Sequence, residues 1–120
     1  MNEKHLTPRG AAKLIYGALE AKQARDVKVL DIHELTTLAD FFIIATGTSS
    51  AHIATLGDEC RRVMKDSGQP PPRAEGAPSS GWVLLDFGSV VLHLFGADAR
   101  AFYSVERLWQ DARIWSGDDL

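Results

Sequence analysis

Residues that could bind an anion stand between a predicted strand and a predicted helix, at Gly47-Thr48-Ser49-Ser50. Backbone N–H groups at the start of a helix attract phosphate, and hydroxyl side chains at the same place cap the helix. The segment lacks the Gly-Lys-Thr ending of a phosphate-binding loop. The sequence therefore favours an ordinary hydroxyl cap, and an anion site is the weaker interpretation.

The carboxylates that could hold catalytic metal ions lack the partners that such chemistry needs. Nucleotidyltransferases follow a Gly-Ser turn with two acidic residues spaced one apart on a nearby strand, where they bind the metals. In this chain Leu84 occupies the partner position of Asp86, and His33 occupies that of Asp31. We therefore expect no two-metal phosphoryl transfer.

The histidines also lack a recognisable catalytic pattern. The four of them, which show neither His-x-His nor His-Glu-x-x-His spacing, are His5, His33, His52 and His93. A serine nucleophile at Ser49 or Ser50 with His52 as base is not favoured, because these side chains point apart on one helical turn. The sequence predicts no enzyme activity, no metal and no cofactor.

The segment from Trp82 to Phe95 has the pattern of a β-hairpin. Apolar runs flank Asp86-Phe87-Gly88-Ser89, and Gly88 can take the positive φ that a tight turn requires. A loop made by Phe87 and Gly88 predicts three cross-strand pairs on one face. These pairs are Asp86–Ser89, Leu84–Val91 and Trp82–His93.

The two faces of this hairpin differ in composition. One is uniformly apolar, as a core wall is, and consists of Val83, Leu85, Val90, Leu92 and Leu94. The other combines large apolar anchors with a few polar groups, as contact surfaces do, and consists of Trp82, Leu84, Asp86, Ser89, Val91, His93 and Phe95. The alternative interpretation of the second face is that a helix covers it and its polar residues lie at the rim.

Length and charge narrow the class of protein. A chain of 120 residues forms one domain with its own core. Its net charge of −3 does not suit a nucleic-acid backbone and suits a basic protein partner better. The single Cys60 excludes an internal disulfide. No run approaches the ~18 apolar residues of a membrane span, and residues 1–5 resemble neither a signal nor a transit peptide, so we expect a cytoplasmic protein.

The remaining pattern predicts the elements that position these residues. Thr7 and Pro8 begin one helix, and a second follows the Gly47 turn. Strands are predicted over 27–32 and 40–46, and a proline-rich loop over 67–81 with a short edge strand at 73–76. A last helix begins with Asp98 as cap and turns five apolar residues inward: Phe102, Val105, Leu108, Trp109 and Ala112. This order predicts a single α/β domain with a mixed β-sheet flanked by helices.

Four segments carry a set of motifs that recur in order and with consistent spacing. They are Asp40-Phe-Phe-Ile-Ile-Ala-Thr-Gly-Thr-Ser-Ser-Ala-His52, Glu75-Gly76, Trp82 through Phe95, and Arg100-Ala-Phe-Tyr-Ser-Val-Glu-Arg-Leu-Trp109. Together they resemble the ribosomal silencing factor family, also called Iojap-like proteins, over about residues 8–112. We assign residues 1–112 to one such domain and expect residues 113–120 to fray as a C-terminal tail.

The resemblance implies both a fold and a function. Family members have a nucleotidyltransferase-like fold without catalytic carboxylates, consistent with the missing acidic partners. They bind the large ribosomal subunit through its fourteenth protein and obstruct joining of the small subunit. Translation is thereby repressed, especially when nutrients are limiting. The implied protein is a non-enzymatic translational repressor.

The resemblance also implies a partner-binding site on the second hairpin face. The family's binding surface includes the hairpin Trp, which corresponds to Trp82, and Asp86, Gly88 and His93 match motif positions. The expected partner-binding residues are Trp82, Leu84, Asp86, Gly88, Val91, His93 and Phe95. The apolar members would anchor the partner, Asp86 would accept from a Lys or Arg, and His93 would lie at the edge.

Two departures from the family pattern and two other functions stay open. Ser89 stands where members often carry an acidic residue, which removes one salt bridge to a basic partner, and Ala51 stands where they carry Arg or Gln. A nucleotide-binding or degenerate nucleotidyltransferase module would use the Gly47–Ser50 turn. A homodimeric adaptor would pair the second hairpin face with itself.

Overall fold

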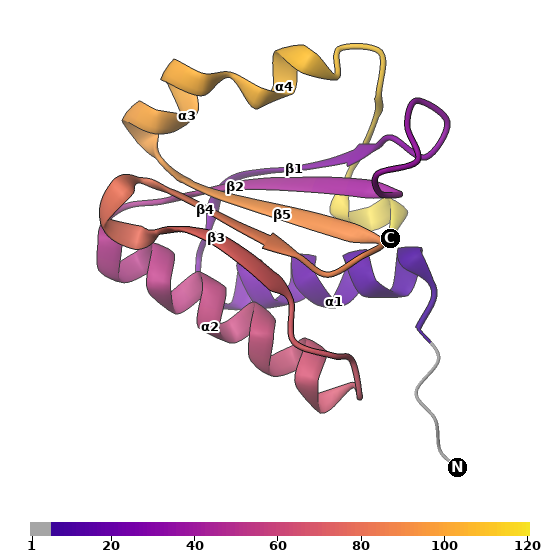
Figure 1. Ribbon diagram of the computed structural model, residues 1–120, viewed down its shortest axis with the longest axis horizontal. Helices are drawn as coiled ribbons and strands as arrows, with labels where there is room; N and C mark the ends of the chain where they lie inside the picture. Colours follow the sequence, from indigo (N-terminus) through magenta and orange to yellow (C-terminus); the bar gives the residue numbers. More distant parts are fainter. Residues whose placement is uncertain (1–5) are drawn as a thin grey trace.

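A six-stranded sheet separates two layers of helices (Figure 1). The structure is a computed structural model that describes residues 6–120, so His5 and the four residues before it lie outside the described part. The strands are β1 (Arg25–Asp31), β2 (Phe41–Gly47), β3 (Arg73–Ala77), β4 (Trp82–Asp86), β5 (Val90–Gly96) and β6 (Arg113–Trp115). They lie in the order β3-β4-β5-β2-β1-β6, with β2 and β5 parallel and the other neighbours antiparallel. This arrangement confirms the predicted single α/β domain with a mixed sheet.

The helices cover opposite faces of the sheet. On one face lie α1 (Pro8–Ala21) and α2 (Ser50–Asp66), and on the other lie α3 (Ala97–Tyr103) and α4 (Val105–Leu108) (Figure 1). Short 3₁₀ turns occupy Pro78–Ser80 and Gly117–Asp119. The predicted helix starts are confirmed, because the Thr7 hydroxyl accepts from Gly10 N at 2.9 Å and the Ser49 hydroxyl accepts from His52 N at 3.0 Å.

Each face of the sheet packs against its own cluster of buried side chains. The larger cluster joins α1 and α2 to the sheet and contains the hairpin residues Val83, Leu85, Val90, Leu92 and Leu94. The smaller cluster lies under α3 and α4 and contains Val91 and Phe95. β2 is buried on both faces, as its apolar composition predicts. The uniformly apolar face of the hairpin is therefore a core wall.

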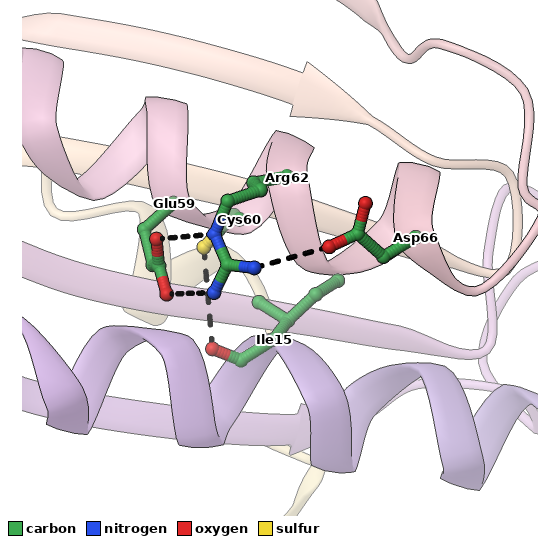
Figure 2. A network of polar contacts seen from close by, with 5 residues as sticks. All are labelled: Ile15, Glu59, Cys60, Arg62 and Asp66. Carbon is green, nitrogen blue, oxygen red and sulfur yellow. Dashed lines mark hydrogen bonds and ion pairs between the residues drawn. The ribbon is translucent and has the colours of Figure 1, made fainter.

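Figure 2 shows how α2 divides its side chains between the core and solvent. The buried Cys60 thiol points toward the Ile15 carbonyl oxygen of α1 at 4.0 Å, and burial raises the pKa of this thiol to about 12. On the exposed side, the Arg62 guanidinium bridges Glu59 at 2.7 Å and Asp66 at 3.0 Å. Cys60 is thus a protonated packing residue and not a reactive thiol.

The hairpin register differs from the predicted one by two residues. Asp86 pairs with Val91, Leu84 with His93, and Trp82 with Phe95. Gly88 lies in the turn with a φ of +94°, as predicted. The prediction erred because it counted Phe87 and Gly88 as the whole loop, whereas Phe87 N donates to Val90 O at 2.9 Å and the turn extends through Ser89. Since side chains alternate with a period of two, an even shift changes every pair and leaves every face assignment intact.

For the last helix, the capping residue and the burial of two apolar side chains were predicted wrongly. β5 runs directly into α3 at Gly96, so Asp98 lies inside the first turn and does not cap the helix. Ser104, in the left-handed region with a φ of 49°, ends α3 and starts α4 in a new direction. Phe102 and Leu108, predicted to face inward, are consequently exposed, whereas Val105 is buried as predicted. Trp109 and Ala112 pack against the smaller cluster.

Residues 113–120 do not fray as expected. β6 pairs with β1 at the edge of the sheet, and the Trp115 indole N–H donates to Asp31 Oδ2 at 3.1 Å. The Trp115 ring also packs edge-on against Phe41, with 5.4 Å between ring centroids. A partly buried aromatic contact and a hydrogen bond therefore hold a chain end that composition alone describes as polar.

Candidate protein-binding surface

Trp82, at the start of β4, is the centre of the candidate site. Its indole N–H donates to His93 Nδ1 across the strand pair at 3.2 Å. One part of the ring packs against Phe95, with 5.0 Å between centroids, and another packs against Tyr103 of α3 at 4.5 Å. Trp82 is therefore held by the sheet from behind and by a helix at its side, while its outer part remains accessible to solvent.

Aromatic side chains lead outward from the core to the surface at this point. Phe95 is fully buried, Trp82 is half-buried, and Tyr103 is 49% exposed. Phe102 packs edge-on against Tyr103 at 5.0 Å and is 80% exposed. We call Trp82, Leu84, Phe102 and Tyr103 the aromatic surface. Large apolar side chains left exposed together in this way are typical of protein-binding sites.

A groove of about 320 Å³ opens at the aromatic surface. Its lining comes from β3, β4, the 3₁₀ turn and α3, and consists of Glu75, Gly76, Ser80, Trp82, Leu84 and Tyr103. Gly76 has a φ of +82°, and a Cβ atom there would lie 2.1 Å from the Trp82 carbonyl oxygen. Only glycine therefore lets β3 approach Trp82 this closely.

The structure divides the seven predicted site residues into an outer and an inner group. Trp82, Leu84 and Asp86 are partly exposed and Gly88 is exposed. Val91, His93 and Phe95 are 7%, 4% and 0% exposed. The inner three lie on the same sheet face as the outer ones, as strand alternation predicts, but the smaller cluster and the α3–α4 layer cover them. The helix-covered interpretation of this face thus holds for β5 and not for the outer edge of β4.

Asp86 has a structural role in the turn. Its Oδ1 accepts from Gly88 N at 2.8 Å, so the carboxylate closes the turn that Gly88 makes possible. Arg73 stands directly across from Asp86 on β3. A cation from a partner would therefore meet a carboxylate that already has one hydrogen bond and a basic neighbour.

Sequence reasoning missed Tyr103 and Glu75 as site residues and placed Phe102 in the core. All three lie in the segments that carried the family resemblance. Glu75 lies on β3 and the two aromatic residues lie on α3. These elements reach β4 through strand pairing and through the packing of Tyr103 on Trp82, which the sequence alone does not show. Two adjacent aromatic residues in one motif were a signal that could have found Phe102 and Tyr103, and no such signal marks Glu75.

The Gly47–Ser50 turn is already occupied by the chain's own groups. Thr48 N donates to His52 Nδ1 at 2.9 Å, and His52 Nε2 lies 2.7 Å from the Lys22 carbonyl oxygen. With Ser49 capping α2, these contacts support the hydroxyl-cap interpretation. A hollow of about 480 Å³ adjoins the turn, between Thr48 and Asp98.

Residues 6–120 contain neither a cluster of metal ligands nor a membrane-spanning helix. Within that range, no three His, Cys, Asp or Glu side chains lie close enough together to hold a metal ion. None of the helices formed by these residues is long and apolar enough to cross a membrane.

Comparison with known proteins identifies the family. A family model described as "Ribosomal silencing factor during starvation" matches residues 5–120. The chain belongs to this family. The ribosomal silencing factor RsfS of Bacillus subtilis is 34% identical to it over 114 residues, which cover 95% of this chain and 92% of that protein. The chloroplastic protein Iojap of Zea mays is 36% identical, over 85% of this chain and 44% of that protein.

A solved structure has the same fold. A crystal structure of a protein from Chromobacterium violaceum superposes with a TM-score of 0.84 at 33% identity, covering 88% of each chain. The ribosomal silencing factor family thus accounts for the fold as well as for the motifs. The nucleotidyltransferase-like character of this fold stays a prediction.

Proposed function

We propose that this chain represses translation in the cytoplasm by binding the large ribosomal subunit. In this proposal it binds through the fourteenth protein of that subunit and sterically blocks joining of the small subunit, chiefly when nutrients are limiting. Membership of the ribosomal silencing factor family supports the ribosomal target. The mechanism requires no reaction, which agrees with the structural roles found for Asp86, His52 and Cys60.

The aromatic surface is the observation that carries the proposal. It places Trp82 and Tyr103 in the lining of a groove, with the exposed Phe102 packed beside Tyr103. Trp and Tyr are among the residues that supply most of the binding energy in protein interfaces. The net charge of −3 and Glu75 at the groove suit a basic partner. Trp82, Leu84, Asp86 and Gly88 are then the contact residues predicted from sequence. Val91, His93 and Phe95 support them from behind.

Sedimentation tests the proposal. Purified protein should sediment with isolated large subunits and should be absent from joined ribosomes. Trp82→Ala should weaken binding by about thirtyfold or more, because truncation of a central interface Trp costs ~2 kcal/mol or more. Leu108→Ala, which removes another exposed apolar side chain outside the groove, is the matched control and should bind normally. Equal binding to joined ribosomes would show that the steric mechanism is wrong.

Two further experiments separate the alternative functions. A nucleotide-binding module would bind ATP or CTP with micromolar affinity at the hollow beside the Gly47–Ser50 turn, and a titration measures this directly. A homodimeric adaptor would bury the aromatic surface against a second copy. In that case sedimentation equilibrium would give a dimer that Trp82→Ala separates.

A further inference from the structure

His93, on β5, is buried among aromatic rings. Its side chain is 4% exposed, and its ring centroid lies 4.9 Å from that of Phe42 and 6.1 Å from that of Phe95. Burial lowers the pKa of His93 to about 4, so the imidazole is neutral at physiological pH. It contacts the candidate site through the hydrogen bond from Trp82 and through the Trp82 ring, with 6.0 Å between the two ring centroids.

That hydrogen bond determines which imidazole nitrogen carries the proton. The Trp82 indole N–H can only donate, so His93 Nδ1 must be the unprotonated acceptor. A neutral imidazole then has its proton on Nε2. Nε2 is buried and has no hydrogen-bond partner among residues 6–120. One ring nitrogen is thus used fully and the other is left unpaired.

Stability does not explain a histidine at this position. A buried donor without a partner costs free energy, and an apolar side chain of similar size would avoid that cost. Val91 and Phe95, two residues before and after on the same face, are both apolar. The group that distinguishes His93 from these neighbours is the acceptor that it offers to Trp82.

We propose that His93 is a positioning residue for Trp82. It holds the indole in one orientation between Phe95 and Tyr103, and it occupies the single donor that the indole has. Trp82 therefore presents only carbon surface to a partner. The group that it receives is an apolar side chain or a Lys or Arg side chain on the ring face, and not a hydrogen-bond acceptor. This inference rests on the proposed function, in which Trp82 is a contact residue.

Two substitutions separate positioning from packing. His93→Leu fills a similar volume and removes the acceptor, whereas the carboxamide oxygen of His93→Asn lies where Nδ1 lies and keeps it. We expect His93→Leu to melt close to the wild type, because it removes the unpaired Nε2–H donor but leaves the Trp82 N–H without its acceptor, and to bind isolated large subunits roughly threefold to tenfold more weakly. His93→Asn should bind within about twofold of the wild type, even if its smaller side chain lowers the melting temperature. A merely structural histidine predicts the reverse, with binding following stability.

Nitrogen NMR of the unmodified protein gives a second readout that does not depend on folding of a variant. At pH 7 the His93 Nδ1 should show the chemical shift of an unprotonated nitrogen, and Nε2 that of a protonated one. Trp82→Phe identifies the indole N–H signal of Trp82, which should move in His93→Leu and stay close to its original position in His93→Asn. The opposite tautomer, or normal binding by His93→Leu, would overturn the inference.

Failure of this inference is distinguishable from failure of the proposed function. If Trp82→Ala loses binding and His93→Leu does not, the ribosomal function stands and positioning by His93 is wrong. If Trp82→Ala binds normally, the contact surface itself is wrong, and the tautomer measurement still decides whether His93 orients the indole.

Discussion

At the scale of single residues, His93 makes the stability of the fold depend on pH. The pKa of its imidazole falls from 6.5 to about 4 on burial, so the unfolded chain binds a proton more readily than the folded chain between these values. Above pH 6.5 His93 is neutral in both the folded and the unfolded chain, and the free energy of unfolding is at its full value with respect to this group. As the pH falls from 6.5 toward 4, the unfolded chain takes up the proton and the free energy of unfolding decreases. We expect a loss of about 2 to 3 kcal/mol between pH 7 and 4.5, measured by urea unfolding. His93→Asn should lose much less over the same range, and an unchanged slope in that variant would assign the acid sensitivity elsewhere.

Gly76 is the residue whose backbone sets the distance between β3 and Trp82. Gly76→Ala adds a Cβ that would meet the Trp82 carbonyl oxygen, in a conformation that side chains rarely adopt. We expect it to destabilise the fold by about 3 kcal/mol or more. Gly88→Ala is the matched control, because its φ is also positive but nothing lies within 4 Å of the added Cβ, so it should lose only about 1 to 2 kcal/mol. Equal losses in urea unfolding would mean that the close approach carries no cost.

At the scale of elements, the hairpin separates a core face from a contact face. Leu92→Asp buries a carboxylate in the larger cluster and should unfold a domain that has only ~5–15 kcal/mol of stability. Asp86→Arg should fold, with a loss of about 1 kcal/mol from the opened turn, and should bind large subunits at least tenfold more weakly. Asp86→Asn keeps the turn acceptor and isolates the effect of charge. Thermal melts and subunit binding decide, and a folded Leu92→Asp would mean that the faces exchange roles.

A largely buried cation, Arg100, connects the α3–α4 layer to the sheet. The Arg100 guanidinium donates to Thr46 Oγ1 at 2.9 Å, to the Asp26 carbonyl oxygen, and to Glu106 Oε2 at 3.0 Å. Burial would raise the pKa of Glu106, but the hydrogen bond and charge of Arg100 outweigh it and lower the pKa. Arg100→Ala should destabilise the domain by about 2 kcal/mol and expose α3 amides to hydrogen exchange. Arg107→Ala, on the exposed side of α4, should do neither, and protected α3 amides in Arg100→Ala would show that the anchor is unnecessary.

At the scale of the whole molecule, the proposed repression depends on the order of assembly. A domain bound at the subunit interface excludes the small subunit only if it arrives first. We expect that adding the protein to large subunits before small subunits lowers the joined fraction in a sucrose gradient, whereas adding it after joining has little effect. Trp82→Ala should restore joining at the same concentration. If the protein lowers the joined fraction equally in both orders of addition, the mechanism is not steric exclusion.

Local patterns in the sequence determined most elements and their faces. The caps at Thr7 and Ser49, the buried strand β2, and Gly88 in the turn follow from residue type and nearest neighbours. The hairpin faces were predicted correctly although the register was not, because a period of two survives an even shift. Trp82 on an outward face was therefore readable from the chain alone.

Tertiary structure decided what covers each face. The return of β6 to β1 and the packing of Tyr103 on Trp82 join residues far apart in sequence. No local pattern encodes the burial of His93 or the exposure of Phe102, since each depends on where a short helix comes to rest. The alternation of side chains along a strand determines the face of the sheet on which each residue lies. Only the packing of distant elements determines whether that face is exposed to solvent or covered by another part of the chain.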